Sequence, residues 1–331
     1  MADEFNARKV SPSRIGTYAD CGYAFKLKYL DRVQPEREGT AALFGKVMHH
    51  ARERWVLDRD KDLIELTRQA WVELTKDDPP SAAFLRQYAA LSNRAIRETE
   101  MIMRRRPDLR APRMTKDWKQ SKIAREINAL LAEWIPKLEA SRYDFGERDP
   151  LPGLYDESLT LAWKYADRWK HLPNAFVSEL AFDFEWQGFH LVGYIDDISP
   201  LVSPEGEVLG HAIVDAKTYK NEPHAFKDWR QLVIYKLAYR HLEDNGLLPF
   251  PPHPKLYSCI DRMRMLDRVF YDPDERDERR LLMELETYER AVENHIFIPA
   301  SKTCKADWCD FAKTCAFHHG SSAQPVELNV A

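Results

Sequence analysis

Two stretches decide the fold, FHLVGYIDDI at Phe189–Ile198 and GHAIVDAKT at Gly210–Thr218. Apolar residues recur in the first with the period of a β-strand, and the second has the denser apolar pattern of a buried strand. Their short connection allows them to pair in one sheet. Asp196, Asp215 and Lys217 are then expected to meet at one edge of it. Asp215 and Lys217 are two residues apart, so their side chains share one face of the strand.

This set of side chains suits metal-dependent attack on a phosphodiester. Carboxylates bind a hard divalent cation, while an amine orients the attacking water and offsets the charge that builds on the phosphate. Asp-x-Lys is also a common tripeptide, and a hairpin that ends in solvated charges would carry the same residues. The rest of the chain has to distinguish the two interpretations.

The composition is that of a globular protein with a sizeable core. The chain has 331 residues, of which 44% are hydrophobic, enough for one large domain or two ordinary ones. The sequence contains no run of about 18 uncharged apolar residues, so no membrane span is predicted. The acidic N-terminus lacks the apolar centre of a signal peptide, so we expect a cytoplasmic protein without a membrane partner.

The net charge of −4 does not by itself indicate a nucleic-acid-binding protein. Between Arg104 and Arg125, however, nine Lys or Arg residues face only two acidic ones. This basic stretch is interpreted either as a DNA contact or as a solvated helix face.

Periodicity predicts a mixture of helices and strands. Residues 1–9 are expected to be disordered, and Ser11-Pro-Ser13 to begin one helix that continues through Tyr18, Cys21, Phe25 and Tyr29. A long charged helical region follows the motif GKVMH at Gly45–His49. Further along the chain, we expect strands at 175–184, 255–260 and 269–271, and helices at 156–169, 229–239 and 275–293. The helix at 229–239 places Gln231 and Tyr235 one above the other at i and i+4.

Taken together and in this order, these pieces resemble the RecB-like branch of the PD-(D/E)XK nuclease superfamily. More narrowly, they resemble its iron–sulfur exonucleases, which include the CRISPR-associated adaptation exonuclease and phage homologues. The motifs that carry the resemblance are the Cys21 segment, Gly45–His49, Gly193–Asp196, Asp215–Lys217 and Gln231–Tyr235. The helical region around 60–150 has no counterpart in it.

The resemblance implies a site that binds Mg²⁺ or Mn²⁺. Its ligands would be His49, Asp196, Asp215 and the carbonyl of Ala216, with Lys217 next to the attacking water. Gln231 and Tyr235 would contact the nucleic acid and support the site, which completes the implied catalytic set of Asp196, Asp215, Lys217, Gln231 and Tyr235. His50 could substitute for His49. Glu179, one strand earlier, either supports the ligands or is a solvated carboxylate.

The resemblance also implies a [4Fe–4S] cluster held by Cys21, Cys304, Cys309 and Cys315. The family usually has two residues between the first two C-terminal cysteines, whereas this chain has four. The spacing of Cys304, Cys309, Cys315 and His319 also fits a Cys3His zinc site, which leaves Cys21 without a role. Cys259 is interpreted as a core residue.

We therefore predict an α/β protein with a PD-(D/E)XK, restriction-endonuclease-like core, in which helices flank a central mixed sheet. The expected divisions are motif helices at 1–59, a helical insertion at 60–150, the nuclease core at 151–298, a cysteine segment at 299–320 and a disordered tail at 321–331. The expected function is a Mg²⁺- or Mn²⁺-dependent DNA exonuclease, with endonuclease action on single strands also open. Its setting would be DNA repair, recombination, phage DNA processing or CRISPR adaptation, with protein partners in recombination or CRISPR adaptation. The alternatives are a non-catalytic DNA-binding adaptor, for which a catalytic residue should be missing, and a zinc-finger nucleic-acid module.

Overall fold

The computed structural model describes residues 6–35, 37–105, 121–145, 150–203, 205–218, 229–300, 309–312 and 314–317. The chain forms two compact units. Unit 1 consists of Met1–Glu36, Glu53–Lys61 and Tyr165–Ala331, and unit 2 consists of Arg37–Arg52 and Asp62–Lys164. Cys304, His319 and most of the basic stretch at 104–125 lie outside the described residues.

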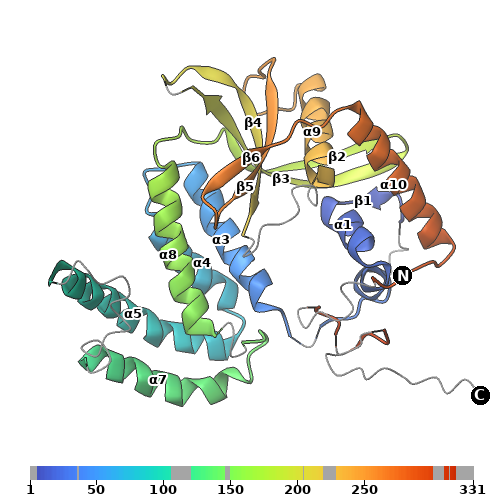
Figure 1. Cartoon of the computed structure of the whole chain (residues 1–331). Coiled ribbons are helices and arrows are strands. Elements are labelled where there is room, and N and C mark those ends of the chain that lie inside the picture. The colour runs from blue at the N-terminus through green and yellow to red at the C-terminus, as the bar shows by residue number, and fades with distance from the viewer. Residues whose placement is uncertain are drawn as a thin grey trace, which may run out of the picture. The chain divides into compact units, whose positions relative to one another are not determined.

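Unit 1 is built on a sheet in which six strands are described (Figure 1). The strands are β1 (Lys9–Val10), β2 (Val177–Trp186), β3 (Phe189–Val202), β4 (Val208–Lys217), β5 (Leu256–Arg262) and β6 (Asp267–Phe270). β3 pairs antiparallel with β2 and β4, and β4 pairs parallel with β5, which is antiparallel to β6. The expected α/β class, with helices flanking a central mixed sheet, is confirmed.

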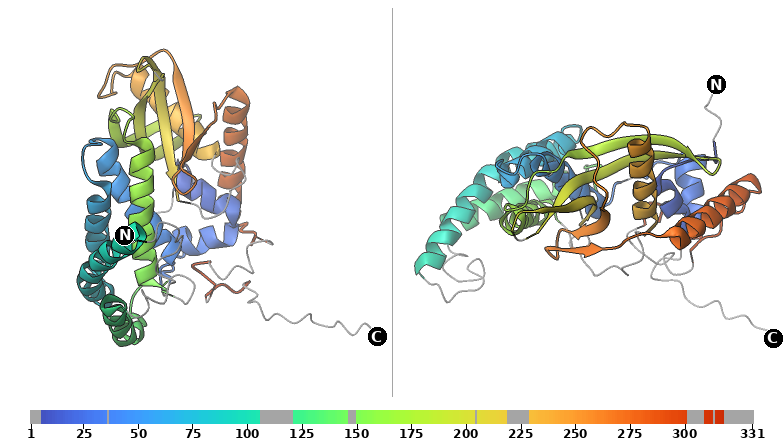
Figure 2. Two further views of the ribbon diagram at one scale, coloured as in Figure 1. Left: turned by 60° about the vertical axis from the view of Figure 1, so that its left-hand side comes forward. Right: turned by 90° about the horizontal axis from the view of Figure 1, so that it is seen from above.

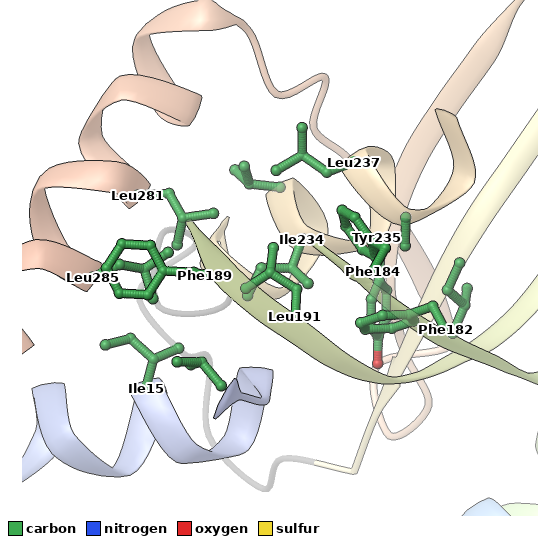
Figure 3. Close-up of a cluster of buried hydrophobic side chains, with 14 of the residues drawn as sticks. Ile15, Phe182, Phe184, Phe189, Leu191, Ile234, Tyr235, Leu237, Leu281 and Leu285 are labelled. Carbon is green, nitrogen blue, oxygen red and sulfur yellow. The ribbon is translucent and has the colours of Figure 1, made fainter. Parts of the chain in front are cut away.

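The helices of unit 1 cover one face of this sheet. They are α1 (Pro12–Asp20), α2 (Gly22–Phe25), the π-helix η1 (Lys26–Leu30), α9 (Trp229–Asp244) and α10 (Glu275–Glu293). α9 connects the parallel strands β4 and β5 and contacts β2 and β4, and α10 packs beside it (Figures 1 and 2). Figure 3 shows the resulting core, where Ile15 and Leu285 meet Phe189 of the sheet.

Two predictions about the N-terminal segment are wrong. Disorder is expected through residue 9, but Lys9 forms β1 with Val10, and the two pair parallel with His190 and Leu191 of β3, while residues 1–5 lie outside the described residues. Val10 is fully buried, so its burial holds the segment in place. The single helix expected from Ser11 to Tyr29 is interrupted because Cys21 is extended, with φ −161° and ψ 107°.

Local sequence explains the β2–β3 hairpin. Gln187 and Gly188 both have positive φ, 50° and 81°, as the two central residues of a type I′ turn require. Gly193, farther along β3, faces the ring of Phe182, and a Cβ at this position would lie 2.7 Å from the ring's Cζ atom. The glycine of the GYID motif is therefore needed for Phe182 to fill the core.

Unit 2 is helical. It contains α4 (Leu63–Thr75), α5 (Pro79–Arg105), α7 (Lys122–Leu138), and most of α3 (Thr40–Val56) and α8 (Leu151–Trp169). Buried polar contacts join its helices, since Trp71 donates to Ser158 and Tyr88 donates to Asp156, both at 2.8 Å. Across the described parts of the chain, we find no helix long and apolar enough to cross a membrane.

Candidate active site

The candidate catalytic residues of unit 1 come from β3, β4 and α9. Asp215 and Lys217 end β4, and the ammonium of Lys217 lies 2.6 Å from Oδ1 of Asp215. The Asp215 side chain is fully buried, whereas that of Lys217 keeps 17% of its surface exposed. A buried carboxylate paired with a partly exposed ammonium gives this strand end a polar group that solvent and substrate can reach.

Helix α9 holds this ammonium from the other side. Oε1 of Gln231 accepts from Nζ of Lys217 at 3.0 Å, and Nε2 of Gln231 donates to the hydroxyl of Tyr235 at 2.6 Å. Gln231 and Tyr235 are one helical turn apart, as their i, i+4 spacing predicts, and their side chains are in direct contact. The amide of Gln231 thus links the lysine to the tyrosine.

Tyr235 carries the chain of hydrogen bonds on to Asp196 of β3. Its hydroxyl donates to Oδ1 of Asp196 at 3.3 Å, and the backbone N–H of Ala216 donates to Oδ2 at 2.9 Å. Burial and the negative charges of Asp196 and Asp215 together raise the pKa of Tyr235 well above its usual value. The tyrosine therefore stays protonated and acts as a donor near both carboxylates.

The arrangement can bind a cation through hard oxygen ligands. The charges of Asp196 and Asp215 both act on one hydroxyl, so the two carboxylates converge on the same region between β3, β4 and α9. This is the donor chemistry that Mg²⁺ and Mn²⁺ prefer. Within the described parts of the chain, no three His, Cys, Asp or Glu residues form a group that could hold a metal ion.

His49 lies on α3 in unit 2, so its distance from the carboxylates of unit 1 stays a prediction. Its neighbour His50 is hydrogen-bonded to Glu73 of α4. Glu179 is exposed on β2 and has the positive φ of 51°.

A second polar cluster surrounds Asp261 of β5 and was not predicted from the sequence. Asp261 of β5 pairs in register with Ala216, is fully buried, and accepts hydrogen bonds from Tyr165 and Arg268. Burial by itself would lower the pKa of Arg268, but the nearby charges of Asp261, Tyr165, Cys259 and Asp197 together raise it. The signal that could have found the cluster is an aspartate directly after the apolar run of β5.

The turn between β5 and β6 holds the backbone at the end of β4. Met263 donates its backbone N–H to the carbonyl of Lys217 at 2.9 Å, and Nε of Arg264 donates to the carbonyl of Thr218 at 2.8 Å. These contacts fix the end of β4 from which Lys217 projects.

Three of the four predicted cluster cysteines, Cys21, Cys309 and Cys315, are described, and these three do not form a group that could hold a metal ion. Burial raises the pKa of Cys309, and the charges of Cys21 and Cys315 raise it further. Sγ of Cys21 accepts backbone N–H groups from Ala24 and Ala300, both at 3.4 Å. Cys259 is buried in β5, away from this set in the sequence, and packs with core residues of β4.

The family model described as "PD-(D/E)XK nuclease superfamily" matches residues 9–316. A search among curated proteins finds no match. The matched range includes every strand of the sheet together with Asp196, Asp215, Lys217 and the helix that supports them. On this evidence, the chain belongs to the PD-(D/E)XK nuclease superfamily.

Proposed function

We propose that this protein is a metal-dependent deoxyribonuclease that degrades DNA from its ends. The observation that carries the proposal is a continuous series of hydrogen bonds in a protein of the nuclease superfamily. It runs from Asp215 through Lys217, Gln231 and Tyr235 to Asp196. Catalysis of phosphodiester hydrolysis needs a positive charge near the phosphate and a correctly oriented water. The ammonium of Lys217 is the proposed source of the charge and the proposed donor to the water.

The proposed cation ligands in unit 1 are Asp196, Asp215 and the carbonyl of Ala216. His49 is proposed as a further ligand only because the Gly45–His49 motif stands where the resemblance places a histidine ligand. A bound Mg²⁺ or Mn²⁺ would supply a polarised water and neutralise charge on the phosphate. In our proposal, the remaining N–H of Lys217 would orient the attacking water, and its positive charge would offset the charge that builds on the phosphate. Gln231 keeps the ammonium in place, and Tyr235 keeps the Asp196 carboxylate turned toward the site.

The test is cleavage of DNA by the full-length protein with Mg²⁺ or Mn²⁺. We expect shortening of end-labelled linear DNA, and a loss of about 100-fold or more in rate for Lys217→Ala, because the charge near the phosphate is removed. Lys255→Ala removes a lysine outside the site and is the matched control. Unchanged rates in Lys217→Ala would contradict the catalytic assignment.

The same assay separates exonuclease from endonuclease action. A circular single-stranded substrate has no ends, so an exonuclease leaves it intact while it degrades the linear form of the same sequence. Labels at the 5′ and 3′ ends report the polarity of digestion. Nicking of the circle would replace the exonuclease proposal with the endonuclease one.

We further propose that Cys21, Cys304, Cys309 and Cys315 bind a [4Fe–4S] cluster with a structural role. The support is that the charges of Cys21 and Cys315, from opposite ends of the chain, both act on the Cys309 thiol, while the fourth proposed ligand, Cys304, lies outside the described residues. Thiolates are the usual ligands of such clusters. A zinc site formed by the three C-terminal cysteines and His319 is the competing assignment, and metal analysis of anaerobically purified protein separates the two.

A further inference from the structure

In β2 and β3, the alternation of side chains between the two faces of the sheet is interrupted at paired positions. Leu180 and Val177 of β2 both pack against the core beneath α9, although they are three residues apart. Ile195 and Ile198 of β3 do the same. In a regular strand, residues whose side chains share a face are an even number of positions apart. A separation of three therefore means that two successive residues in each strand do not alternate.

The register shows where the break lies. Ser178 pairs with Asp197, and Leu180 pairs with Ile195, which leaves Glu179 opposite Asp196 between the two pairs. Both strands have one residue in this gap, so the pairing continues without a shift. The break is therefore a local turn of the backbone shared by the two strands rather than an inserted residue.

Glu179 has the backbone conformation that makes this turn. Its φ of 51° lies in the left-handed region, which is costly for any residue with a Cβ atom. The other described residues with positive φ and a side chain, Arg32, Gln187, Leu266 and His295, lie in turns or just after helices. Strain kept inside a strand is characteristic of functional sites.

The consequence falls on Asp196. Ile195 faces α9, so regular alternation would turn Asp196 to the opposite face, where Asp197 accepts from Ser199 at 2.6 Å. Instead, the Asp196 carboxylate accepts from Tyr235 of α9 and from the N–H of Ala216. The hydroxyl of Ser178 donates to the backbone carbonyl of Asp196 at 2.8 Å, which ties the two strands together at the break.

We propose that Ser178 and Glu179 are positioning residues, whose backbone turn aims the Asp196 carboxylate into the cation site. This inference rests on the proposed function, because it takes Asp196 to be a cation ligand. It assigns the role to the conformation at position 179, and it predicts that the Glu179 carboxylate can be replaced.

The test measures the affinity of the full-length protein for Mn²⁺ by calorimetry. Glu179→Val places a β-branched residue where φ is positive, a conformation that such residues resist most strongly. We expect affinity to fall about 10- to 100-fold, as for other residues that orient a metal ligand. Glu179→Gly, Glu179→Ala and Glu179→Gln should stay within about twofold of the wild-type protein, since each accepts the turn at least as well as glutamate does.

Glu185 provides the matched control, because it is exposed on the same strand and pairs regularly with His190. Glu185→Val should leave Mn²⁺ affinity unchanged. Melting temperatures give a second readout that needs no metal. At position 179 the glycine variant should melt above the alanine variant, and at position 185 the order should reverse, because glycine is favoured only where φ is positive.

The outcomes distinguish this inference from the proposed function. If the wild-type protein and Asp196→Asn bind Mn²⁺ equally, the proposed cation site is wrong. If the wild-type protein binds Mn²⁺ more tightly than Asp196→Asn, and Glu179→Val binds as the wild type does, the positioning role is refuted. It is also refuted if Glu179→Gly and Glu179→Gln lose as much affinity as Glu179→Val, because the carboxylate is then the operative group.

Discussion

The ammonium of Lys217 is held between Oδ1 of Asp215 and Oε1 of Gln231, at 2.6 and 3.0 Å. A lysine side chain has several rotatable bonds, so one contact alone would leave the ammonium free to move about the carboxylate. The second contact, from a helix packed on the sheet, restricts it to one place. At the scale of single residues, preorganisation therefore depends on an amide that performs no chemistry itself.

Gln231→Ala tests this dependence. Removing the amide frees the Lys217 ammonium and takes a donor from Tyr235, so kcat on linear DNA should fall about 10- to 100-fold. KM for DNA should change by less than about threefold, since the charge that attracts the phosphate remains. Steady-state kinetics on end-labelled DNA measure both constants.

Asp244→Ala removes an exposed side chain at the far end of the same helix and should leave both constants unchanged. A Gln231→Ala defect confined to KM would mean that the amide contacts the nucleic acid rather than holding Lys217.

At the scale of the elements, β3 and α1 each contain a glycine, and only the one in β3 has no room for a Cβ atom. A Cβ at Gly193 of β3 would lie 2.7 Å from the Phe182 ring, and 3.4 Å from Cδ of Pro12. A Cβ at Gly16 of α1 would meet nothing within 4 Å. The first glycine is needed for packing between β2 and β3, whereas the second only weakens its helix.

Gly193→Ala should lower the free energy of unfolding by about 1–3 kcal/mol, because the buried Phe182 ring has to shift. Gly16→Ala should raise it by about 0.5–1 kcal/mol, since alanine is the better helix former. Urea unfolding of the two variants in parallel gives both values. Equal effects at the two positions would contradict the packing argument.

Taken as a whole, the chain brings its two ends together within unit 1. The ring of Tyr23 contacts the ring of Phe317, with centroids 4.8 Å apart, and Sγ of Cys21 accepts from the backbone of Ala300. A cluster at this place would cross-link segments almost 300 residues apart in the sequence. Its loss should therefore affect stability before it affects chemistry.

Cys21→Ala tests the cluster. Anaerobically purified wild-type protein should be brown and hold about four iron atoms per chain, as a [4Fe–4S] cluster requires. The variant should lose most of its iron and melt at a lower temperature. Cys259→Ala removes a buried core cysteine and should retain the iron. Colourless wild-type protein with one equivalent of zinc, unaffected by Cys21→Ala, would support the zinc site instead.

Much of the core could be predicted from sequence patterns because those patterns act locally. The alternation of Phe189 and Leu191 and the apolar run before Asp215 predict β3 and β4 from the period of a strand alone. The charged helical pattern of residues 275–293 predicts α10 with the observed bounds. Asp215 and Lys217 share a face for the same local reason, since they are two residues apart in an extended chain.

Features that depend on contacts between distant segments could not be predicted from these local patterns. Lys9 and Val10 form a strand only because β3 offers them a partner. Asp261 enters a buried cluster only because α8 and β6 bring Tyr165 and Arg268 to it. Sequence spacing alone selected the candidate catalytic residues of this protein. Tertiary structure alone decided that Asp196 faces α9, because a strand's alternation is broken there by a backbone turn shared with its neighbour.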